Sequence, residues 1–400
     1  MLEFRSANTR AVNPHRAVME AFDLAYGDTS PDCDLVLMNS AMGHDLTVLS
    51  ENVRSQCPNA RVLVASCAGV VGRDGPGESL HDIAALYLRG DGFSVAHIDG
   101  LFGSTSFEKG VELATGLLNA PYPVRMVYLL ASGIDIANDR LIAGIESVLG
   151  PDVVLFGATS SDQMQGIATF QCVDGVRYRH GAFAVGIWDP TLTVDTQASH
   201  GFVAVGEPFV VTKAAGNRIF ELDGKPAWPT YTERLGLSAT ATTGDTIPIG
   251  ALAELLPGNL AAEYGNPHIL RVVTHFTEEG ALVYATECEN GTQLWLTVRD
   301  EDRIFCDMDR MLGAMTARSP GAPPVVVFQA DCLARGRRLL NRVMKEELVR
   351  QIQQPFESSG DVPPWFGMYG FGEYARLGGR NAYHNYTTAL AALYRSDQES

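Results

Sequence analysis

The stretch DLVLMNSAMGHDLTVLSENVRSQCPNARVLVASCAGVVG (residues 34–72) has two counterparts later in the chain. One is VRMVYLLASGIDIANDRLIAGIESVLGPDVVLFGATSSD (124–162), and the other begins PPVVVFQADCLARGRRLLN at 323 and ends WFGMYGFGEY at 374. Each has an apolar run, a polar loop, a helical segment and a second apolar run. Val/Leu-rich runs of this length are typical of strands buried on both faces, and a helix between them indicates a βαβ crossover. We predict a mixed α/β fold of repeated βαβ units, forming mostly parallel sheets with antiparallel hairpin additions.

The loops that follow the repeated strands are the first candidates for a binding site. Parallel strands carry the loops at their carboxyl ends to the same edge of a sheet, where ligands usually bind. The loops concerned are SCAGVVG (66–72), GATSSDQ (157–163) and GFGEY (370–374). We therefore predict that these three segments meet around one pocket.

Composition and charge exclude several classes of function. Of the 400 residues 46% are hydrophobic and 19% are charged, which is typical of a packed globular protein. The net charge of −17 argues against binding to nucleic acid or to an anionic membrane surface. The sequence lacks an apolar run long enough to span a membrane and an apolar leader, and its seven cysteines include no CxxC motif. We predict a soluble, cytoplasmic protein with reduced cysteines.

The length and a change of pattern predict two modules. From residue 167 the sequence alternates around Asp174-Gly175, a strong signal for a two-residue hairpin turn. A turn-rich stretch near 240–258 then precedes three short strands and the third repeat. We place the modules at 30–230 and 231–390, and exposed strand edges in the second make a homodimer a candidate assembly.

Three longer segments carry a resemblance to a known family. They are LFGATSSDQMQGIATFQCVDGVRYRHGAFAVGI (155–187), VTKAAGNRIFELDGKPAWPTYTERLG (211–236) and YGFGEYARLGGRNAYHNYTTAL (369–390). The chain resembles the FIST sensory proteins, in which FIST N and FIST C modules occur together. The family's Gly-Cys-Ser-Thr-x-Gly-Glu pattern is replaced here by SCAGVVG, which keeps Cys67 but loses the hydroxyl and acidic side chains.

The resemblance implies a non-catalytic, bacterial-type regulator of intracellular signal transduction. It implies a small ligand such as an amino acid, and an output that passes through a separate signalling protein. Some members that are similar in sequence bind haem and report nitric oxide to a partner kinase or cyclic-dinucleotide enzyme. A haem-binding gas sensor is therefore an alternative function for this chain.

The best polar constellation lies near the end of the chain. Glu373 and Tyr374 follow a predicted strand end, and His384 and Asn385 come about ten residues later, across a Gly-Gly turn. The Glu373 carboxylate can hold a ligand amine, while Asn385 and Thr387 can bind its carboxylate. In the competing structural interpretation, Glu373 pairs with a nearby arginine and His384 caps a helix.

Two further loops supply candidate ligand-binding residues. Thr159, Ser160 and Asp162 provide hydroxyls and a carboxylate at a strand end, where such loops bind anions, and Ser66 and Cys67 lie at the first strand end. The alternative is a turn whose side chains bond their own backbone. The missing P-loop lysine and GxGxxG motif argue against a nucleotide.

Two less favoured chemistries use cysteine or histidine. Cys67 with His44 as its base is the candidate pair for a Cys-dependent hydrolase, although a buried, inert thiol is the common fate of a free cysteine. Haem requires an axial histidine, and the missing CxxCH motif excludes covalent attachment. His384 is the preferred axial candidate, and the other candidates are His44, His180, His200 and His275.

Overall fold

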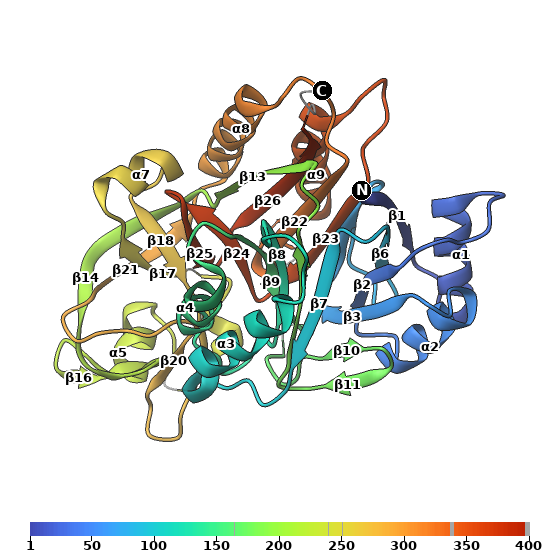
Figure 1. The fold of residues 1–400 in the computed structure, drawn as a ribbon. Coiled ribbons are helices and arrows are strands. Elements are labelled where there is room, and N and C mark those ends of the chain that lie inside the picture. Colours follow the sequence, from blue (N-terminus) through green and yellow to red (C-terminus); the bar gives the residue numbers. More distant parts are fainter. Residues whose placement is uncertain (164, 239, 250, 337–339, 397–400) are drawn as a thin grey trace.

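The computed structural model describes residues 1–163, 165–238, 240–249, 251–336 and 340–396. These residues form three units with one order of elements, at 3–89, 93–187 and 192–395, and a fourth region inserted into the third unit (Figure 1). Unit 1 contains β1 (Glu3–Thr9), α1 (Pro14–Tyr26), β2 (Leu35–Ala41), α2 (Leu46–Gln56), β3 (Arg61–Cys67), β4 (Val70–Gly72), β5 (Gly75–Gly77) and β6 (Ile83–Arg89). Unit 2 contains β7 (Phe93–Ile98), α3 (Ser106–Leu117), β8 (Met126–Ala131), α4 (Asn138–Leu149), β9 (Val154–Thr159), β10 (Gln171–Val173), β11 (Val176–Tyr178) and β12 (Ala182–Ile187).

The third unit follows the same order but is interrupted. It contains β13 (Leu192–Ser199), α8 (Glu301–Arg318), β22 (Val326–Cys332), α9 (Arg342–Gln353), β23 (Trp365–Gly370), β24 (Gly372–Leu377), β25 (Arg380–His384) and β26 (Thr388–Arg395). The inserted region contains β14 (Phe202–Ala215), β15 (Arg218–Leu222), β16 (Lys225–Pro226), α5 (Ala227–Arg234), α6 (Thr243–Thr246), β17 (Leu252–Leu255), α7 (Gly258–Tyr264), β18 (His268–Arg271), β19 (Val273–Phe276), β20 (Leu282–Tyr284) and β21 (Gln293–Arg299). Short 3-10 turns span Gly103–Thr105, Leu333–Arg335 and Gln354–Phe356.

Each unit centres on one parallel βαβ pair, as the repeats predict. The parallel pairs are β2–β3, β8–β9 and β22–β23. Each lies in a six-stranded sheet, with the orders β1-β6-β2-β3-β10-β11, β7-β12-β8-β9-β24-β25 and β13-β26-β22-β23-β4-β5. We call these sheets 1, 2 and 3. The mixed α/β class is confirmed, but antiparallel pairing is more extensive than the sequence predicts, because strands from flanking segments extend each pair on both sides.

The units exchange hairpins in a cycle. The hairpin of unit 1 (β4–β5) extends sheet 3, that of unit 2 (β10–β11) extends sheet 1, and that of unit 3 (β24–β25) extends sheet 2. Each chain segment therefore crosses from one sheet to the next directly after β3, β9 or β23. The three crossing points lie at the carboxyl ends of the parallel strands, where the sequence places the candidate loops.

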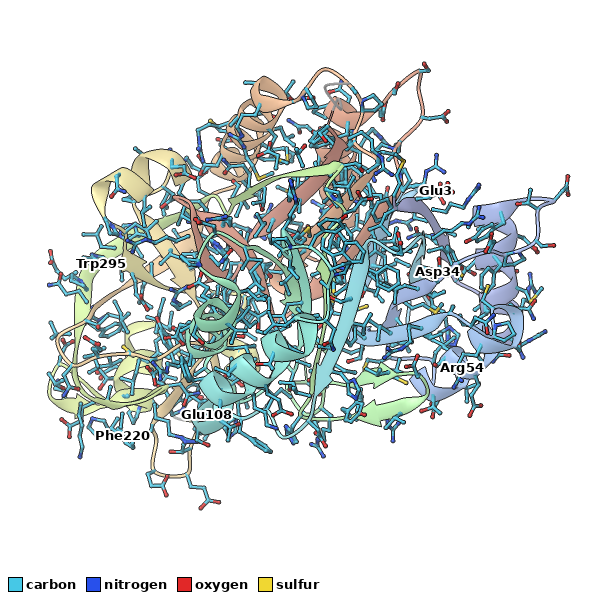
Figure 2. All side chains as sticks on the ribbon, viewed as in Figure 1. Glu3, Asp34, Arg54, Glu108, Phe220 and Trp295 are labelled. Carbon is cyan, nitrogen blue, oxygen red and sulfur yellow. The ribbon has the colours of Figure 1, made fainter. Side chains whose placement is uncertain are left out.

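The three sheets share a central core, and helices cover their outer faces (Figures 1 and 2). Leu37, Leu130 and Phe328, from sheets 1, 2 and 3, belong to one buried cluster, and the rings of Tyr128 and Phe328 lie 5.0 Å apart across it. Helices α1 and α2 cover sheet 1, α3 and α4 cover sheet 2, and α8 and α9 cover sheet 3. Alternating strand residues therefore face either the common core or a helical layer.

Local sequence signals account for the element boundaries in the repeats. The Asp45 side chain accepts hydrogen bonds from the first turn of α2, and Asn13 caps α1, in which Pro14 is the first residue. Asp174 and Gly175 both have positive φ, as a type I′ hairpin turn requires. The division of the chain at residue 230 stays a prediction; that residue lies in α5 of the inserted region. In the described ranges, no helix is sufficiently long and apolar to cross a membrane.

Candidate functional site

The three crossing segments meet through hydrogen bonds. The Ser66 hydroxyl donates to the Ser161 carbonyl (3.1 Å), and the Ser161 hydroxyl donates to the Tyr369 carbonyl (2.6 Å). The Ala68 amide donates to the Ser161 hydroxyl (2.9 Å), and the Phe371 amide donates to the Thr159 carbonyl (3.1 Å). Segments separated by about 90 and 200 residues in sequence therefore come together, as predicted.

This junction is filled with protein groups rather than open. Thr159, Ser160 and Ser161 are fully buried, and the Thr159 hydroxyl lies 3.3 Å from the Tyr383 hydroxyl. The Asp162 carboxylate accepts hydrogen bonds from four backbone amides of the loop at 165–168. Ser161 and Asp162 thus bond mainly to the backbone around them, the structural alternative that the sequence left open.

The first core-facing residue of each exchanged hairpin occupies an equivalent position. These residues are Gln171, Glu373 and Val70, which pair with Ala65 of β3, Ala158 of β9 and Met368 of β23. The chain therefore places an amide, a carboxyl group and an apolar side chain at three related sites in the interior. All are buried, so the polar pair requires bonding partners.

Gln171 has partners, whereas Glu373 does not. The Gln171 amide donates to the Ser160 hydroxyl (2.8 Å), and its carbonyl accepts from the Gly181 amide (3.3 Å). Among the described residues, neither carboxyl oxygen of Glu373 has a hydrogen-bond partner with good geometry. One reason lies in the crossing segment of each residue's own unit, where Ser160, two residues after Ala158 of β9, is matched by Gly370, two residues after Met368 of β23.

His384 faces the same side of the hairpin as Glu373, because the two residues pair across β24 and β25. Its Nδ1 lies 3.2 Å from the Tyr264 hydroxyl, and its Nε2 has no partner within the described chain. Both Glu373 and His384 have no exposed surface. Burial, followed by the nearby Asp331, raises the pKa of Glu373 well above its usual value, while burial and then Arg271 lower the pKa of His384 to about 3. Both side chains are therefore held in their neutral forms.

A buried ion pair lies beside these two residues. Arg335 Nε is 3.1 Å from Asp331 Oδ1, and both side chains are at most 3% exposed. Arg335 also donates to the His200 carbonyl (2.9 Å), and the Asp331 carboxylate accepts from the Thr388 hydroxyl (2.9 Å). We call Glu373, His384, Tyr264, Asp331 and Arg335 the Glu373 cluster. Asp331 was not predicted as a site residue. It is the last residue but one of β22, so the strand-end rule that selected Glu373 applies to it equally.

The charges around the cluster leave Glu373 as the unmatched acid. Asp331 is paired with Arg335, and Glu254 of β17 lies 3.4 Å from Arg271 of β18. The Thr387 amide, Arg335 and the Cys332 thiol each act to lower the pKa of Glu373, but burial and Asp331 outweigh them, and none of the three bonds to the carboxyl group with good geometry. One cationic or hydrogen-bonding group placed beside Glu373 would therefore satisfy its unbonded carboxyl group.

The other polar residues predicted for this site form hydrogen bonds with groups outside the Glu373 cluster. Tyr374 faces the helical layer and donates to the Asn138 side chain. The Asn385 amide donates to the Phe371 carbonyl (3.0 Å) and accepts from the Val272 amide (3.1 Å). The Thr387 hydroxyl donates to the Asn385 carbonyl (2.8 Å). Asn385 and Thr387 therefore position the hairpin and its connection to β26.

Cys67 lies in the central core and has no exposed surface. Burial raises the pKa of its thiol, which disfavours the thiolate that nucleophilic catalysis needs. His44 contacts a different group: its Nε2 lies 3.2 Å from the His81 carbonyl. The geometry thus gives no support to a hydrolase that uses this pair.

The groups around His384 bear on the alternative that this protein binds haem. Its free Nε2 suits an axial ligand, but the ring packs against Tyr264 (5.6 Å between centroids) and the fully buried Glu373 lies opposite it. In the ranges that the structure describes, no group of three or more His, Cys, Asp or Glu side chains is arranged to hold a metal ion. A porphyrin therefore does not fit around His384 in this conformation.

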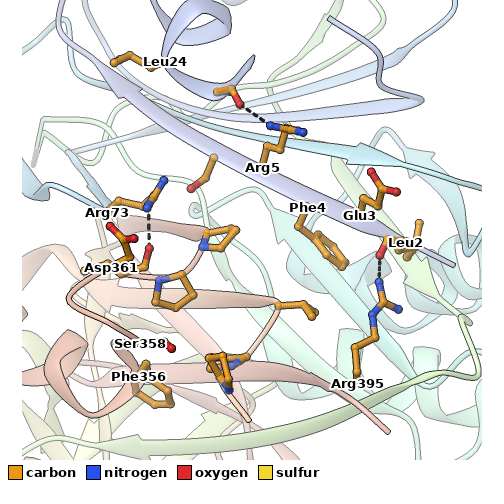
Figure 3. A pocket seen from close by; sticks show the side chains of 18 residues that line it. Leu2, Glu3, Phe4, Arg5, Leu24, Arg73, Phe356, Ser358, Asp361 and Arg395 are labelled. Carbon is orange, nitrogen blue, oxygen red and sulfur yellow. Dashed lines mark hydrogen bonds between the residues drawn. The ribbon is translucent and has the colours of Figure 1, made fainter. Parts of the chain in front are cut away.

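Open hollows lie away from the Glu373 cluster. One of about 610 Å³ runs along the seam between β1 and the residues that lead into β22 and β23, with Arg5, Arg73 and Asp361 in its walls (Figure 3). This seam lies at the amino ends of β22 and β23, whereas Asp331 lies at the carboxyl end of β22 and Glu373 follows the carboxyl end of β23. Glu373 and His384, which have no exposed surface, are therefore closed off from solvent in this conformation.

Comparisons with known proteins identify two domains. The FIST N domain matches residues 34–225, and the FIST C domain matches residues 227–376. The chain is 28% identical over 220 residues to the uncharacterized protein Mb0898c of Mycobacterium bovis, and 26% identical over 209 residues to the uncharacterized protein Rv0628c of Mycobacterium tuberculosis. The matches cover 54% and 52% of both chains, so the chain spans about half the length of these relatives.

A solved structure was also found at low similarity. The cyanuric acid hydrolase of A. caulinodans covers 99% of this chain and 100% of its own, with 8% sequence identity and a TM-score of 0.38. This similarity is too low to indicate a shared activity.

Proposed function

The chain belongs to the FIST family, whose domains are associated with sensory signal transduction, and we propose that it is a cytoplasmic, non-catalytic sensor of a small ligand. The ligand binds in the Glu373 cluster, and the signal passes to a separate output protein. One observation carries this proposal: Glu373 and His384 are fully buried, face the same side of one hairpin and have unbonded polar atoms. Buried polar groups are otherwise almost always bonded, so such a pair indicates a partner that the chain does not supply.

The chemistry of the cluster favours a compact polar ligand. An ammonium group, as in an amino acid, would bond to Glu373 and supply the missing positive charge. An acceptor or donor beside it would reach His384 Nε2, whose role is set by the hydrogen bond that Nδ1 makes with the Tyr264 hydroxyl.

Ligand entry couples binding to a change of shape. Tyr264 ends α7 of the inserted region, and its hydroxyl lies 3.2 Å from His384. The inserted region therefore covers the cluster from one side and has to move when a ligand enters. A ligand that binds only one arrangement shifts the population toward it, which gives a partner protein a difference to recognise.

A thermal-shift screen of the full chain tests this function. The probes are amino acids, primary amines and small organic acids, each applied to wild type, Glu373→Gln and Asp361→Asn. We expect at least one amine-bearing probe to raise the melting temperature of wild type and Asp361→Asn, but not of Glu373→Gln. Stabilisation that Asp361→Asn abolishes would place the ligand in the seam hollow instead, and no stabilisation by any probe would contradict the proposal.

A further inference from the structure

Cys33 and Cys57 form a close contact that the candidate site does not use. Their sulfur atoms lie 3.3 Å apart, although the two residues are 24 positions apart in sequence. Cys33 precedes β2, and Cys57 follows the last residue of α2, where its amide donates to the Val53 carbonyl. The sequence shows seven scattered cysteines without a paired framework, and this contact arises only when the first βαβ unit folds.

We propose that Cys33 and Cys57 are an oxidation site, at which hydrogen peroxide converts the two thiols into one intramolecular disulfide. One sulfur attacks a peroxide oxygen, the O–O bond breaks, and a sulfenic acid and one water form. The second sulfur then attacks the sulfenic sulfur, the S–S bond forms and a second water leaves. Two thiols and one peroxide thus become one disulfide and two waters, with sulfur oxidised and peroxide reduced.

The geometry favours the second step. A disulfide bond is about 2.05 Å long, so the two sulfur atoms have to approach each other by roughly 1.3 Å. Cys33 precedes β2 and Cys57 follows α2, so both lie outside the regular hydrogen bonding of these elements, where the backbone can adjust to the shorter distance. In contrast, Cys306 is exposed on α8 and shows no contact with another sulfur atom among the described residues.

A small oxidant has a route to the pair. A hollow of about 230 Å³ is lined by Tyr26, Asp32 and Tyr87, among others. Tyr26 and Tyr87 both lie near enough to Cys33 for its charge to alter their pKa values, so this hollow opens beside the pair. Cys33 is 7% exposed and Cys57 is 6% exposed, which suits hydrogen peroxide better than a protein oxidant.

The surroundings make this a slow oxidation site. Burial raises the pKa of both thiols, and the neighbouring Asp34 and Asp32 raise the pKa of Cys33 and Cys57 respectively. Arg5 lies over the Tyr26 ring rather than beside a sulfur atom, so this cation does not stabilise a thiolate directly. Because the thiolate is the nucleophile, the rate of oxidation rises about tenfold for each pH unit while both pKa values stay above the pH.

The disulfide would fasten α2 to the amino end of β2, the end of sheet 1 opposite the crossing points. It closes a loop of 24 residues. We expect the melting temperature to rise by roughly 3–6 °C, from the usual effect of a loop of this size. This inference does not depend on the proposed ligand, because the Glu373 cluster lies near the carboxyl ends of the parallel strands, whereas Cys33 lies at the amino end of β2.

Peptide mapping of the full chain after peroxide treatment tests the inference. We expect a linked peptide pair containing Cys33 and Cys57, formed about tenfold faster at pH 8 than at pH 7 and reversed by dithiothreitol. Cys33→Ser should abolish the link and leave a Cys57 sulfenic acid that dimedone traps, whereas Cys172→Ser should leave the link intact. If Cys33 and Cys57 of the wild-type protein stay fully alkylatable after Cys306 has been oxidised, the proposal is wrong.

Discussion

Gln171 and Glu373 occupy equivalent positions in sheets 1 and 2, yet within the described part of the chain Gln171 has hydrogen-bond partners and the Glu373 carboxyl group has none. Gln171 has Ser160 and the Gly181 amide as partners, whereas Glu373 has Gly370 where a serine would stand. The backbone arrangement is the same, because both residues begin a hairpin that crosses from one unit to the next sheet. The difference therefore teaches that the repeated fold alone does not make a binding site. The side chains of unit 3, together with the inserted region, form the proposed site.

The largest expected effect concerns the buried ion pair of Asp331 and Arg335, which lies beside Glu373 and has no counterpart beside Gln171 among the described residues. Asp331 lies five residues along β22, and the equivalent residue of β8 is Ala131. Arg335→Met leaves Asp331 buried without its cation, which should lower the free energy of unfolding by about 3–5 kcal/mol. Denaturant unfolding measures the change. Arg342→Met, in an exposed ion pair, is the matched control, and equal effects of the two substitutions would contradict the role given to Arg335.

The next effect comes from making the Gln171 site resemble the Glu373 site. Gln171→Glu removes the amide donor to Ser160 and places a carboxyl group in the core. We expect a loss of about 1–3 kcal/mol of stability at pH 7, because the new group lacks a full set of partners. Gln293→Glu, at an exposed residue of β21, is the control. A Gln171→Glu protein as stable as this control would show that the two positions differ less than the structure indicates.

The reverse substitution, Glu373→Gln, should remove a pH dependence of the free energy of unfolding. The folded pKa of Glu373 is raised, so its contribution to stability is complete below about pH 4.5 and is lost as the pH rises toward the folded pKa. Ligand-free Glu373→Gln should therefore gain stability relative to wild type by up to about 1.4 kcal/mol per pH unit above pH 5. Chemical unfolding at pH 5, 6, 7 and 8 measures this, and parallel profiles would contradict it.

An effect of opposite sign should appear in acid. The folded pKa of His384 is lowered to about 3, so between pH 6.5 and 3 the unfolded chain binds a proton that the folded chain does not. The free energy of unfolding should therefore fall by about 1.4 kcal/mol per pH unit as the pH drops through this window. The substitution His384→Gln should remove this contribution to the pH dependence. His200, whose pKa is also lowered to about 3, continues to contribute in the variant. An unchanged acid profile of His384→Gln would show that His384 is protonated in the folded protein.

Local patterns predicted the repeated elements because their signals lie within short windows. The Val/Leu-rich runs and the Asp174-Gly175 turn each act over a few residues. The cyclic exchange of hairpins was not predictable in this way. Strands β4 and β5 have three residues each and lack a clear alternation, so their partner in sheet 3 is set by distant packing.

In the candidate site, too, some features follow from local sequence patterns and others do not. The strand-end rule found Glu373 and brought Ser66 and Thr159 to the right junction, because parallel strands impose that geometry. It did not reveal that Ser161 and Asp162 bond to the backbone, or that Tyr264 reaches the cluster from the inserted region. These contacts depend on loop conformations and on pairs of residues more than 100 positions apart, which periodicity does not encode.

A crystal structure of the chain with the amine-bearing ligand found by the screen would test the central claim most directly. We predict electron density for the ligand between the Glu373 carboxyl group and His384 Nε2, with the ion pair of Asp331 and Arg335 intact and Tyr264 displaced or bonded to the ligand. Density for protein atoms alone at that position, with Glu373 bonded to a group of its own chain and the ligand elsewhere, would contradict the account.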